Sequence, residues 1–141
     1  MDVINQEALL DRFGGWPSFH DAEIYSLRLD SGQRSDGLVR LQLDIHVFAV
    51  DGTLPNGRFN FVKHTLVTLE FEDVEAAGLD GFGPQNVLDG LTLEEVTVAA
   101  GRQVEVTLPA SNGLDGRFRC RSVTVLAAAP MTPGPHSVYR T

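Results

Sequence analysis

Cysteine, long apolar runs and basic residues are all scarce in this chain, and each shortage argues against a particular kind of structure or partner. The 141 residues include a single cysteine, Cys120, so no disulfide forms within the chain and a reducing compartment suits it. No apolar run approaches the roughly 20 residues that span a bilayer. The first residues, from Met1 to Asn5, are not a basic segment before an apolar run, as a secretory signal would be. We therefore expect a cytoplasmic protein without a membrane partner.

Basic residues are outnumbered, with 11 Lys and Arg against 19 Asp and Glu, which gives a formal net charge of −8. An acidic field repels DNA and RNA, so a nucleic-acid partner is disfavoured. The same field attracts a basic partner and raises its association rate. Acidic charge also serves solubility alone. The charge therefore leaves two interpretations open: a surface that draws in a basic protein, or one that only keeps the chain dissolved.

The signatures of common catalytic and cofactor sites are missing as well. There is no G-x-S-x-G nucleophile elbow, and the glycines between Gly78 and Pro84 lack the Lys and Ser/Thr of a phosphate loop. No His or Cys pair has the spacing of a zinc site. Cys120 alternates with Phe118 on a predicted strand, which is typical of a small buried residue rather than a nucleophile. We predict no catalytic residue, no metal and no cofactor.

What the chain does contain is alternation of apolar and polar residues, the pattern of half-buried strands. A short helix is predicted for residues 3–13, ended by Gly14 and Gly15. Strands are expected from the 21–23 region to 29 and at 38–50, 60–73, 91–98, 103–108 and 117–127. Hairpin-length connections favour antiparallel pairing, so we predict a mainly β fold at the margin of α+β, an antiparallel bent sheet or β-sandwich of about six strands with one short N-terminal helix.

Other segments lead to narrower expectations. Residues 1–128 are predicted to form a single domain and residues 129–141 a Pro-rich, disordered C-terminal tail. Residues 75–90 lose the period and are expected to be irregular. The parity change at Glu94 and Glu95 indicates a β-bulge.

Two sets of charged or polar side chains on strands also carry expectations. His46 and His64 fall on polar strand faces and would be neighbours across a hairpin. Arg117, Arg119 and Arg121 alternate on one face, and we expect them to pair with acids such as Asp44 or Glu70 rather than to form a docking stripe.

One segment concentrates aromatic and ionisable side chains at a strand entrance. Residues 14–24 read Gly-Gly-Trp-Pro-Ser-Phe-His-Asp-Ala-Glu-Ile, and their Gly and Pro residues favour a turn. If the strand begins at Asp21, then Asp21 and Glu23 share parity with Tyr25 and lie at the end of the apolar face. An unpaired carboxylate there costs several kcal/mol. We therefore expect Asp21 to be partly buried and to accept hydrogen bonds from the turn backbone or from His20, so that Asp21→Asn costs on the order of 1–3 kcal/mol.

The candidate binding residues, for an interface or for a structural latch, come from this segment: Trp16, Phe19, His20, Asp21 and Glu23. Aromatic residues on such a turn suit the centre of an interface, and they equally suit a core anchor. Adjacent residues of a strand point to opposite faces, so His20 and Asp21 favour a structural hydrogen bond over a metal site.

The segment from Phe13 to Ile24 resembles the immunity protein 50 family, and residues 116–120, Gly-Arg-Phe-Arg-Cys, continue the resemblance more loosely. Members of that family are bacterial proteins thought to protect a cell from a polymorphic toxin encoded beside them. The resemblance implies a non-catalytic protein whose partner is a cognate protein toxin, and the acidic charge suits a basic one.

Two other functions stay open at this point. The first is a small metal- or ligand-binding protein or hydrolase that uses His20, Asp21 and Glu23. The second is a structural homodimer, because Leu66 interrupts an otherwise polar strand face. A metal scan of the purified protein would test the former, and a toxin gene beside the coding sequence would favour the immunity function.

Overall fold

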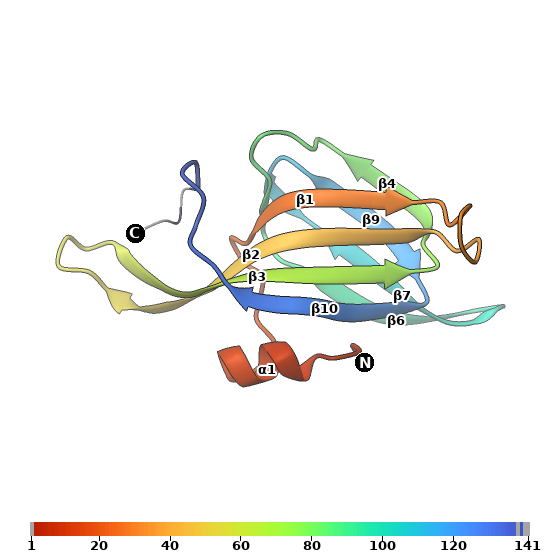
Figure 1. Cartoon of the computed structure of the whole chain (residues 1–141), viewed down its shortest axis with the longest axis horizontal. Coiled ribbons are helices and arrows are strands. Elements are labelled where there is room, and N and C mark those ends of the chain that lie inside the picture. Colours follow the sequence, from red (N-terminus) through yellow and green to blue (C-terminus); the bar gives the residue numbers. More distant parts are fainter. Residues whose placement is uncertain (1, 138, 140–141) are drawn as a thin grey trace.

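A computed structural model describes residues 2–137 and 139 of the chain. Within these residues there are one helix and ten strands, and Figure 1 shows them as two sheets lying face to face. Strand makes up 57% and helix 5%, so the prediction of a mainly β fold with one short helix is confirmed. The elements are α1 (Glu7–Phe13), β1 (Glu23–Asp30), β2 (Arg40–Thr53), β3 (Phe59–Glu72), β4 (Glu75–Asp80), β5 (Val87–Leu88), β6 (Thr92–Val98), β7 (Gly101–Leu108), β8 (Ala110–Asn112), β9 (Asp115–Cys120) and β10 (Ser122–Pro130).

The larger sheet has the order β10-β3-β2-β1-β5-β8 and the smaller sheet the order β4-β9-β7-β6, with antiparallel pairing of the strands. The strand predicted at 117–127 is divided at Arg121. Its first part, β9, pairs with β7 in the smaller sheet, and its second part, β10, pairs with β3 in the larger one. A single stretch of alternating sequence therefore crosses from one layer to the other and ties them together.

The core lies between the two sheets and follows the predicted alternation. The inward residues of β2 and β3 are fully buried, and the ring of Phe71 meets the ring of Phe118 from the smaller sheet edge-on, with centroids 5.0 Å apart. Leu9 is the buried residue of α1, which ends at Gly14 in the left-handed conformation. The core residues on the main strands are Leu41, Leu43, Ile45, Val47, Val67, Leu69, Phe71, Val104, Val106, Leu108, Phe118, Cys120, Val123 and Val125.

Two local expectations were wrong. Residues 75–90 are not irregular, because they contain β4 and the two-residue strand β5. The β-bulge predicted at Glu94 and Glu95 does not occur, because β6 pairs with β7 in unbroken register from Thr92 to Val98. No residue of this edge strand is fully buried, so its sequence pattern is under little constraint from the core.

A bulge occurs instead in β1, which the residue pattern did not predict. Ile24 pairs with Ile45 and Ser26 pairs with Asp44, which leaves Tyr25 as the extra residue. Glu23 consequently lies opposite His46 on the outer face of the larger sheet, not at the end of the apolar face as predicted. The regular alternation through Tyr25 was misleading because the bulge shifts it by one residue.

After β10 the chain turns back across the outer face of the larger sheet (Figure 1). The backbone N–H of Met131 donates to the carbonyl of His64 (3.0 Å), and the N–H of Gly134 donates to the hydroxyl of Tyr25 (3.2 Å). Residues 131–137 and 139, which we call the C-terminal cover, thus pack on a face that the sequence assigned to solvent. The described part of the chain contains no helix long and apolar enough to cross a membrane.

Candidate functional site

The five residues singled out from the sequence divide between core and surface. Phe19 is buried, and the half-buried ring of Trp16 packs on it with centroids 5.5 Å apart. These two aromatics therefore anchor the turn to the core. His20 and Asp21 remain at the surface, and Glu23 is buried on the outer face of the larger sheet.

His20 and Asp21 form the expected contact, but in an exposed position. His20 Nε2 lies 3.5 Å from the Asp21 carboxylate, and the two side chains are 62% and 41% exposed. His20 Nδ1 bonds the carbonyl of Asp89 (2.9 Å), and that bond, followed by the Asp21 charge, raises the pKa of His20. The Asp21 carboxylate also lies near enough to the Tyr139 hydroxyl to raise the pKa of that group. An exposed ion pair of this kind contributes little to stability.

A buried chain of polar groups runs across three strands behind this pair. His46 is fully buried on β2, and its Nδ1 lies 2.7 Å from Glu23 Oε1 on β1. Its Nε2 lies 2.8 Å from His64 Nδ1 on β3, so the predicted neighbours His46 and His64 do meet. Ser137 of the C-terminal cover donates its hydroxyl to the same Glu23 oxygen. An ionised carboxylate only accepts, so His46 donates through Nδ1 and Glu23 receives two donors.

The pKa of His64 is lowered, first by burial and then by the neighbouring His46. Its Nε2 is buried and has no hydrogen-bond partner among the described residues. A neutral ring in this partly buried position avoids the cost of desolvating a charge. His64 is the last member of the chain Glu23–His46–His64, near the aromatic residues of the β2–β3 hairpin, and its surroundings favour the neutral form.

These groups are enclosed by aromatic rings from the β2–β3 hairpin and the C-terminal cover. The centroid of the Tyr139 ring lies 4.6 Å from that of Phe48, in a tilted arrangement, and 5.3 Å from that of Phe61, edge-on. The ring centroids of Tyr25 and His46 are 5.8 Å apart. Burial, together with the charges of Asp21 and Glu23, raises the pKa of Tyr139 to about 12. The rings exclude water from the chain and thereby strengthen its hydrogen bonds.

The lowered pKa of His64 gives stability a pH dependence of known sign. Below pH 6.5, the ordinary pKa of histidine, the unfolded chain binds a proton at His64 that the folded chain resists. The free energy of unfolding therefore decreases as the pH falls. We expect His64→Gln to reduce the loss of unfolding free energy between pH 7.5 and pH 5.5, measured by chemical denaturation. The raised pKa of His20 acts in the opposite direction, so His20→Gln should steepen the loss; an unchanged pH profile in His64→Gln would contradict the assignment.

A groove of about 430 Å³ opens beside the buried chain. Its floor is formed by β1 at the bulge, one wall by the loop that precedes β5, and the other wall by the C-terminal cover. Phe82 on the loop is 52% exposed and Tyr25 on the floor is 40% exposed. The groove is lined by Glu23, Ile24, Tyr25, Phe82, Gly83, Pro84, Gln85, Asn86, Gly134, Pro135, His136 and Ser137.

Asn86 fixes the loop wall of this groove. Its side-chain amide donates to the carbonyls of Gly83 (2.9 Å) and Ile24 (3.4 Å), and its side-chain oxygen accepts from the backbone N–H groups of Gly83 and Leu114, both at 3.0 Å. Gly113 makes the close approach possible, since a Cβ there would lie 2.5 Å from that oxygen. A fully bonded, buried amide makes the wall rigid before any ligand binds.

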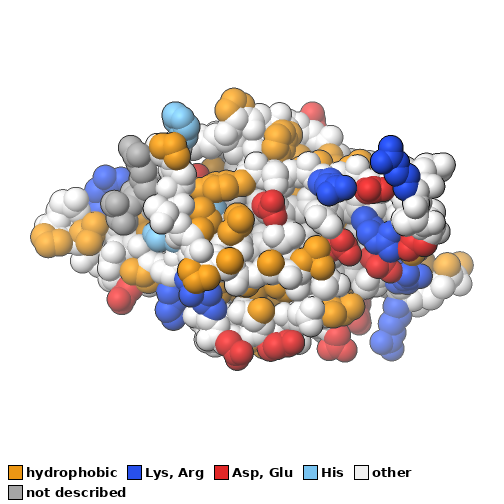
Figure 2. Space-filling view, viewed as in Figure 1, with side chains coloured by type: hydrophobic (Ala, Val, Ile, Leu, Met, Phe, Trp, Pro, Cys, Tyr) orange, Lys and Arg blue, Asp and Glu red, His pale blue; other side chains and the backbone are white. Residues whose placement is uncertain are grey.

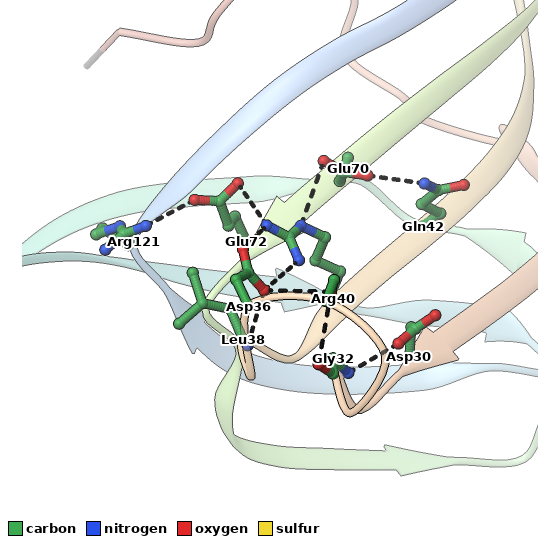
Figure 3. A network of polar contacts seen from close by, with 10 residues as sticks. Asp30, Gly32, Asp36, Leu38, Arg40, Gln42, Glu70, Glu72 and Arg121 are labelled. Carbon is green, nitrogen blue, oxygen red and sulfur yellow. Dashed lines mark hydrogen bonds and ion pairs between the residues drawn. The ribbon is translucent and has the colours of Figure 1, made fainter.

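The opposite end of the outer face carries a polar network centred on Arg40 (Figure 3). The Arg40 guanidinium lies 2.5 Å from Asp36, 3.5 Å from Glu72 and 4.0 Å from Glu70, and it holds the pKa of Asp36 well below its usual range. Arg121 donates to Glu72 at 2.6 Å. Figure 2 shows charged side chains gathered at this end and hydrophobic ones over the middle of the face. The network fastens a loop to the sheet and is structural.

The arginines of β9 are paired with an acid, as expected, although the partner differs from those named. Arg117 and Arg119 both contact Glu105 on the adjacent strand β7, and Arg117 is largely exposed. Asp44 instead accepts hydrogen bonds from Ser26 and Thr68. Arg117 and Arg119 are thus paired with an acid across adjacent strands.

The described residues do not assemble a recognisable hydrolytic centre. Ser137 bonds the carboxylate of Glu23 and not the imidazole of His46, so the described residues do not show the serine–histidine contact of a catalytic triad. Among the described residues no group of three His, Cys, Asp or Glu is arranged to hold a metal ion. The site suits binding through aromatic surface and a buried carboxylate.

Sequence reasoning missed several of these residues. His46 and His64 could have been placed beside Glu23 by the pairing of their strands, because polar residues on adjacent strands meet at fixed register. Ser137 and Phe82 carried no signal, since one follows a Pro-rich stretch and the other sits among glycines.

Comparison with known proteins gives one match. A family model described as immunity protein 50 matches residues 5–131. No curated protein and no solved structure matches the chain. The matched span contains Glu23, His46 and His64 and ends where the C-terminal cover begins, so Ser137 and Tyr139 lie outside it.

Proposed function

Because the chain belongs to the immunity protein 50 family, we propose that it binds a cognate protein toxin and neutralises it without catalysis. The family match over most of the chain is the observation that carries this proposal. The net charge of −8 supports a basic partner, which an acidic surface would attract and steer. The single Cys120, buried and with a pKa raised to about 12, suits an encounter in the reducing cytoplasm.

We place the docking surface at the groove end of the larger sheet. The β2–β3 hairpin extends beyond the body of the sheet there (Figure 1), and it carries Phe59, 61% exposed, and Val50, 53% exposed. On the other side of the C-terminal cover stand Phe82 and Tyr25. Exposed aromatic residues around a rigid groove are typical of the centre of an interface. Of the residues chosen from the sequence, His20, Asp21 and Glu23 border this region, whereas Trp16 and Phe19 support it from the core.

The other two functions have less support. His20 turns toward Asp89 and Asp21, while Glu23 turns toward His46, so a hydrolase or metal site would lack a common centre. Leu66, which suggested a dimer, is half-buried beside Ala129 of β10.

The test is protection of bacteria from the toxin encoded beside the gene. We expect co-expression of this chain to restore growth, and we expect the purified chain to form a stoichiometric complex with the toxin in which neither protein is chemically altered. An association rate that falls with rising salt would support electrostatic steering. Absence of both protection and complex would contradict the proposal, and mass spectrometry showing covalent change of the toxin would contradict binding without catalysis.

A further inference from the structure

Strand β6 leaves one edge of the smaller sheet open (Figure 1). Among the described residues only β7 pairs with it, and the two strands keep an unbroken register from Thr92 to Val98. The remaining sheet edges are short, broken or bordered. Strand β8 has three residues, the register of β4 shifts between Glu75 and Gly78, and β10 is bordered by the N-terminal segment at Ile4. The N–H and C=O groups of β6 that point away from β7 are therefore free to pair with an added strand.

The charged side chains of β6 are two glutamates, one on each face of the sheet. Residues directly opposite each other on adjacent strands share a face. Glu94 lies opposite Glu105 of β7 on the outer face, whereas Glu95 lies opposite the buried Val104, on the face toward the larger sheet. Both glutamates are exposed, and neither forms an ion pair or a side-chain hydrogen bond with another described residue. An added strand would therefore meet an uncompensated carboxylate on either face.

The outer face lacks a cation at this edge. Like charges directly opposite each other destabilise a sheet, and Glu94 and Glu105 are such a pair. The arginines of β9, Arg117 and Arg119, both contact Glu105. The row therefore runs from Arg119 through Glu105 to Glu94, and its last member has no cation beside it. A basic residue on an added strand, opposite Glu94, would complete the row.

A hollow of about 350 Å³ beside the start of β6 adds an apolar contact to the edge. It is lined by Val3, Trp16, Leu91, Thr92 and Leu93. Leu93 shares a face with Glu95, two residues further along the strand. A strand added antiparallel to β6 would place one side chain over the hollow, opposite Leu93, and the two residues before it would meet Glu94 and Glu95. The edge therefore fits a sequence of two basic residues followed by an apolar one.

We propose that the β6 edge pairs with an extended segment of the toxin that carries two adjacent basic residues followed by an apolar one. This inference rests on the proposed function and adds a contact outside the groove end of the larger sheet. A second copy of this chain fits the edge poorly, because antiparallel pairing of β6 with itself brings Glu94 and Glu95 of the two copies together. Main-chain hydrogen bonds would supply affinity, and the two carboxylates would select a basic strand.

A short peptide tests the edge without the toxin. The acetylated and amidated peptide Thr-Thr-Val-Arg-Arg-Leu-Thr, designed to lie antiparallel to β6, is titrated into the ¹⁵N-labelled full-length chain. The same peptide with citrulline in place of both arginines has nearly the same shape but no charge. We expect the arginine peptide to shift the backbone resonances of residues 92–98 and the citrulline peptide to bind about three- to tenfold more weakly. Equal binding of the two peptides, or no shift localised to β6 at about 5 mM arginine peptide, overturns the inference.

Methylation of the peptide backbone separates strand pairing from attraction of charge alone. Alternate N–H groups of an added strand point toward β6, and the others point away from it. One peptide is therefore N-methylated at its second, fourth and sixth residues, and another at its third, fifth and seventh. We expect one of them to lose at least about tenfold in affinity and the other to bind within about threefold of the parent peptide. Similar affinities for the two methylated peptides would show that no strand is added at the edge, and the inference would fail.

A charge reversal then tests the contact in the toxin complex. We expect Glu94→Lys to weaken toxin binding about three- to tenfold. Asp80→Lys is the matched control, since it makes the same change of charge at an exposed acid of β4, on the opposite edge of the same sheet, and it should weaken binding less than about twofold. Both side chains are exposed on edge strands, so both variants are expected to fold.

The outcomes separate this inference from the proposed function. If the wild-type chain protects and the two variants bind the toxin equally well, the toxin contact lies elsewhere and the inference fails alone. If the wild-type chain neither binds nor protects, the proposed function fails and the toxin contact fails with it. The peptide titration then still decides whether the β6 edge pairs with a basic strand.

Discussion

Replacing His46 with leucine is expected to lower the free energy of unfolding by about 3–5 kcal/mol, which is the cost of leaving a buried charge without its partner. His46 is fully buried and donates to Glu23, whose own side chain is 7% exposed. In His46→Leu the carboxylate keeps only part of its hydrogen bonding and stays in a site closed by the C-terminal cover. The change is measured as the shift in denaturant midpoint at pH 7.5.

A double variant distinguishes the lost interaction from a packing effect. Glu23→Leu/His46→Leu removes both polar partners, so we expect its cost to be smaller than the sum of the two single substitutions by about 1–3 kcal/mol. Asp21→Asn is the control. The sequence predicted a cost of about 1–3 kcal/mol for it, but the Asp21 side chain is 41% exposed, so the structure lowers the expected cost to less than about 1 kcal/mol. Strictly additive costs would show that Glu23 and His46 are not coupled. A larger effect at Asp21 than at His46 would show that the exposed carboxylate, and not the buried pair, stabilises this region.

That comparison also shows which part of the site the sequence could reveal. The motif at residues 14–24 marks a turn with two carboxylates near a histidine, but the side chain of Asp21, beside His20, is 41% exposed. The buried hydrogen bond of the site is nevertheless made by Glu23, whose partner His46 is 23 residues away on another strand. Parity assigned Glu23 to the wrong face because the bulge at Tyr25 has no residue signature of its own.

The fold was more predictable than its outer surface. Alternation located β2 and β3 and their buried residues, because one side of each strand faces the core. It could not reveal that His46 on the other side is also buried, since the rings that pack against it come from Tyr25, Phe48 and His64 on three strands. Strands β5 and β8 were missed because two or three residues are too few to show a period.

The rigid wall of the groove depends on Gly113, and its replacement should have the second largest effect. Gly113 has φ +77°, and a Cβ there would lie 2.3 Å from the carbonyl oxygen of Gln85 and 2.5 Å from Asn86 Oδ1. Gly113→Ala therefore combines a left-handed backbone with a clash against the atoms that organise the loop. We expect it to cost about 2–4 kcal/mol and to displace the resonances of the Asn86 side-chain amide.

Gly37 supplies the control that separates these two causes. Its φ of +79° is nearly the same, but a Cβ at Gly37 would meet nothing within 4 Å. Gly37→Ala should therefore show only the backbone cost, about 1–2 kcal/mol, and should leave Asn86 undisturbed. Because backbone strain is matched, the excess cost of Gly113→Ala measures the close packing behind the groove wall. Equal midpoints for the two variants would mean that the loop moves without loss of stability, so that Gly113 does not set the rigidity of the groove wall.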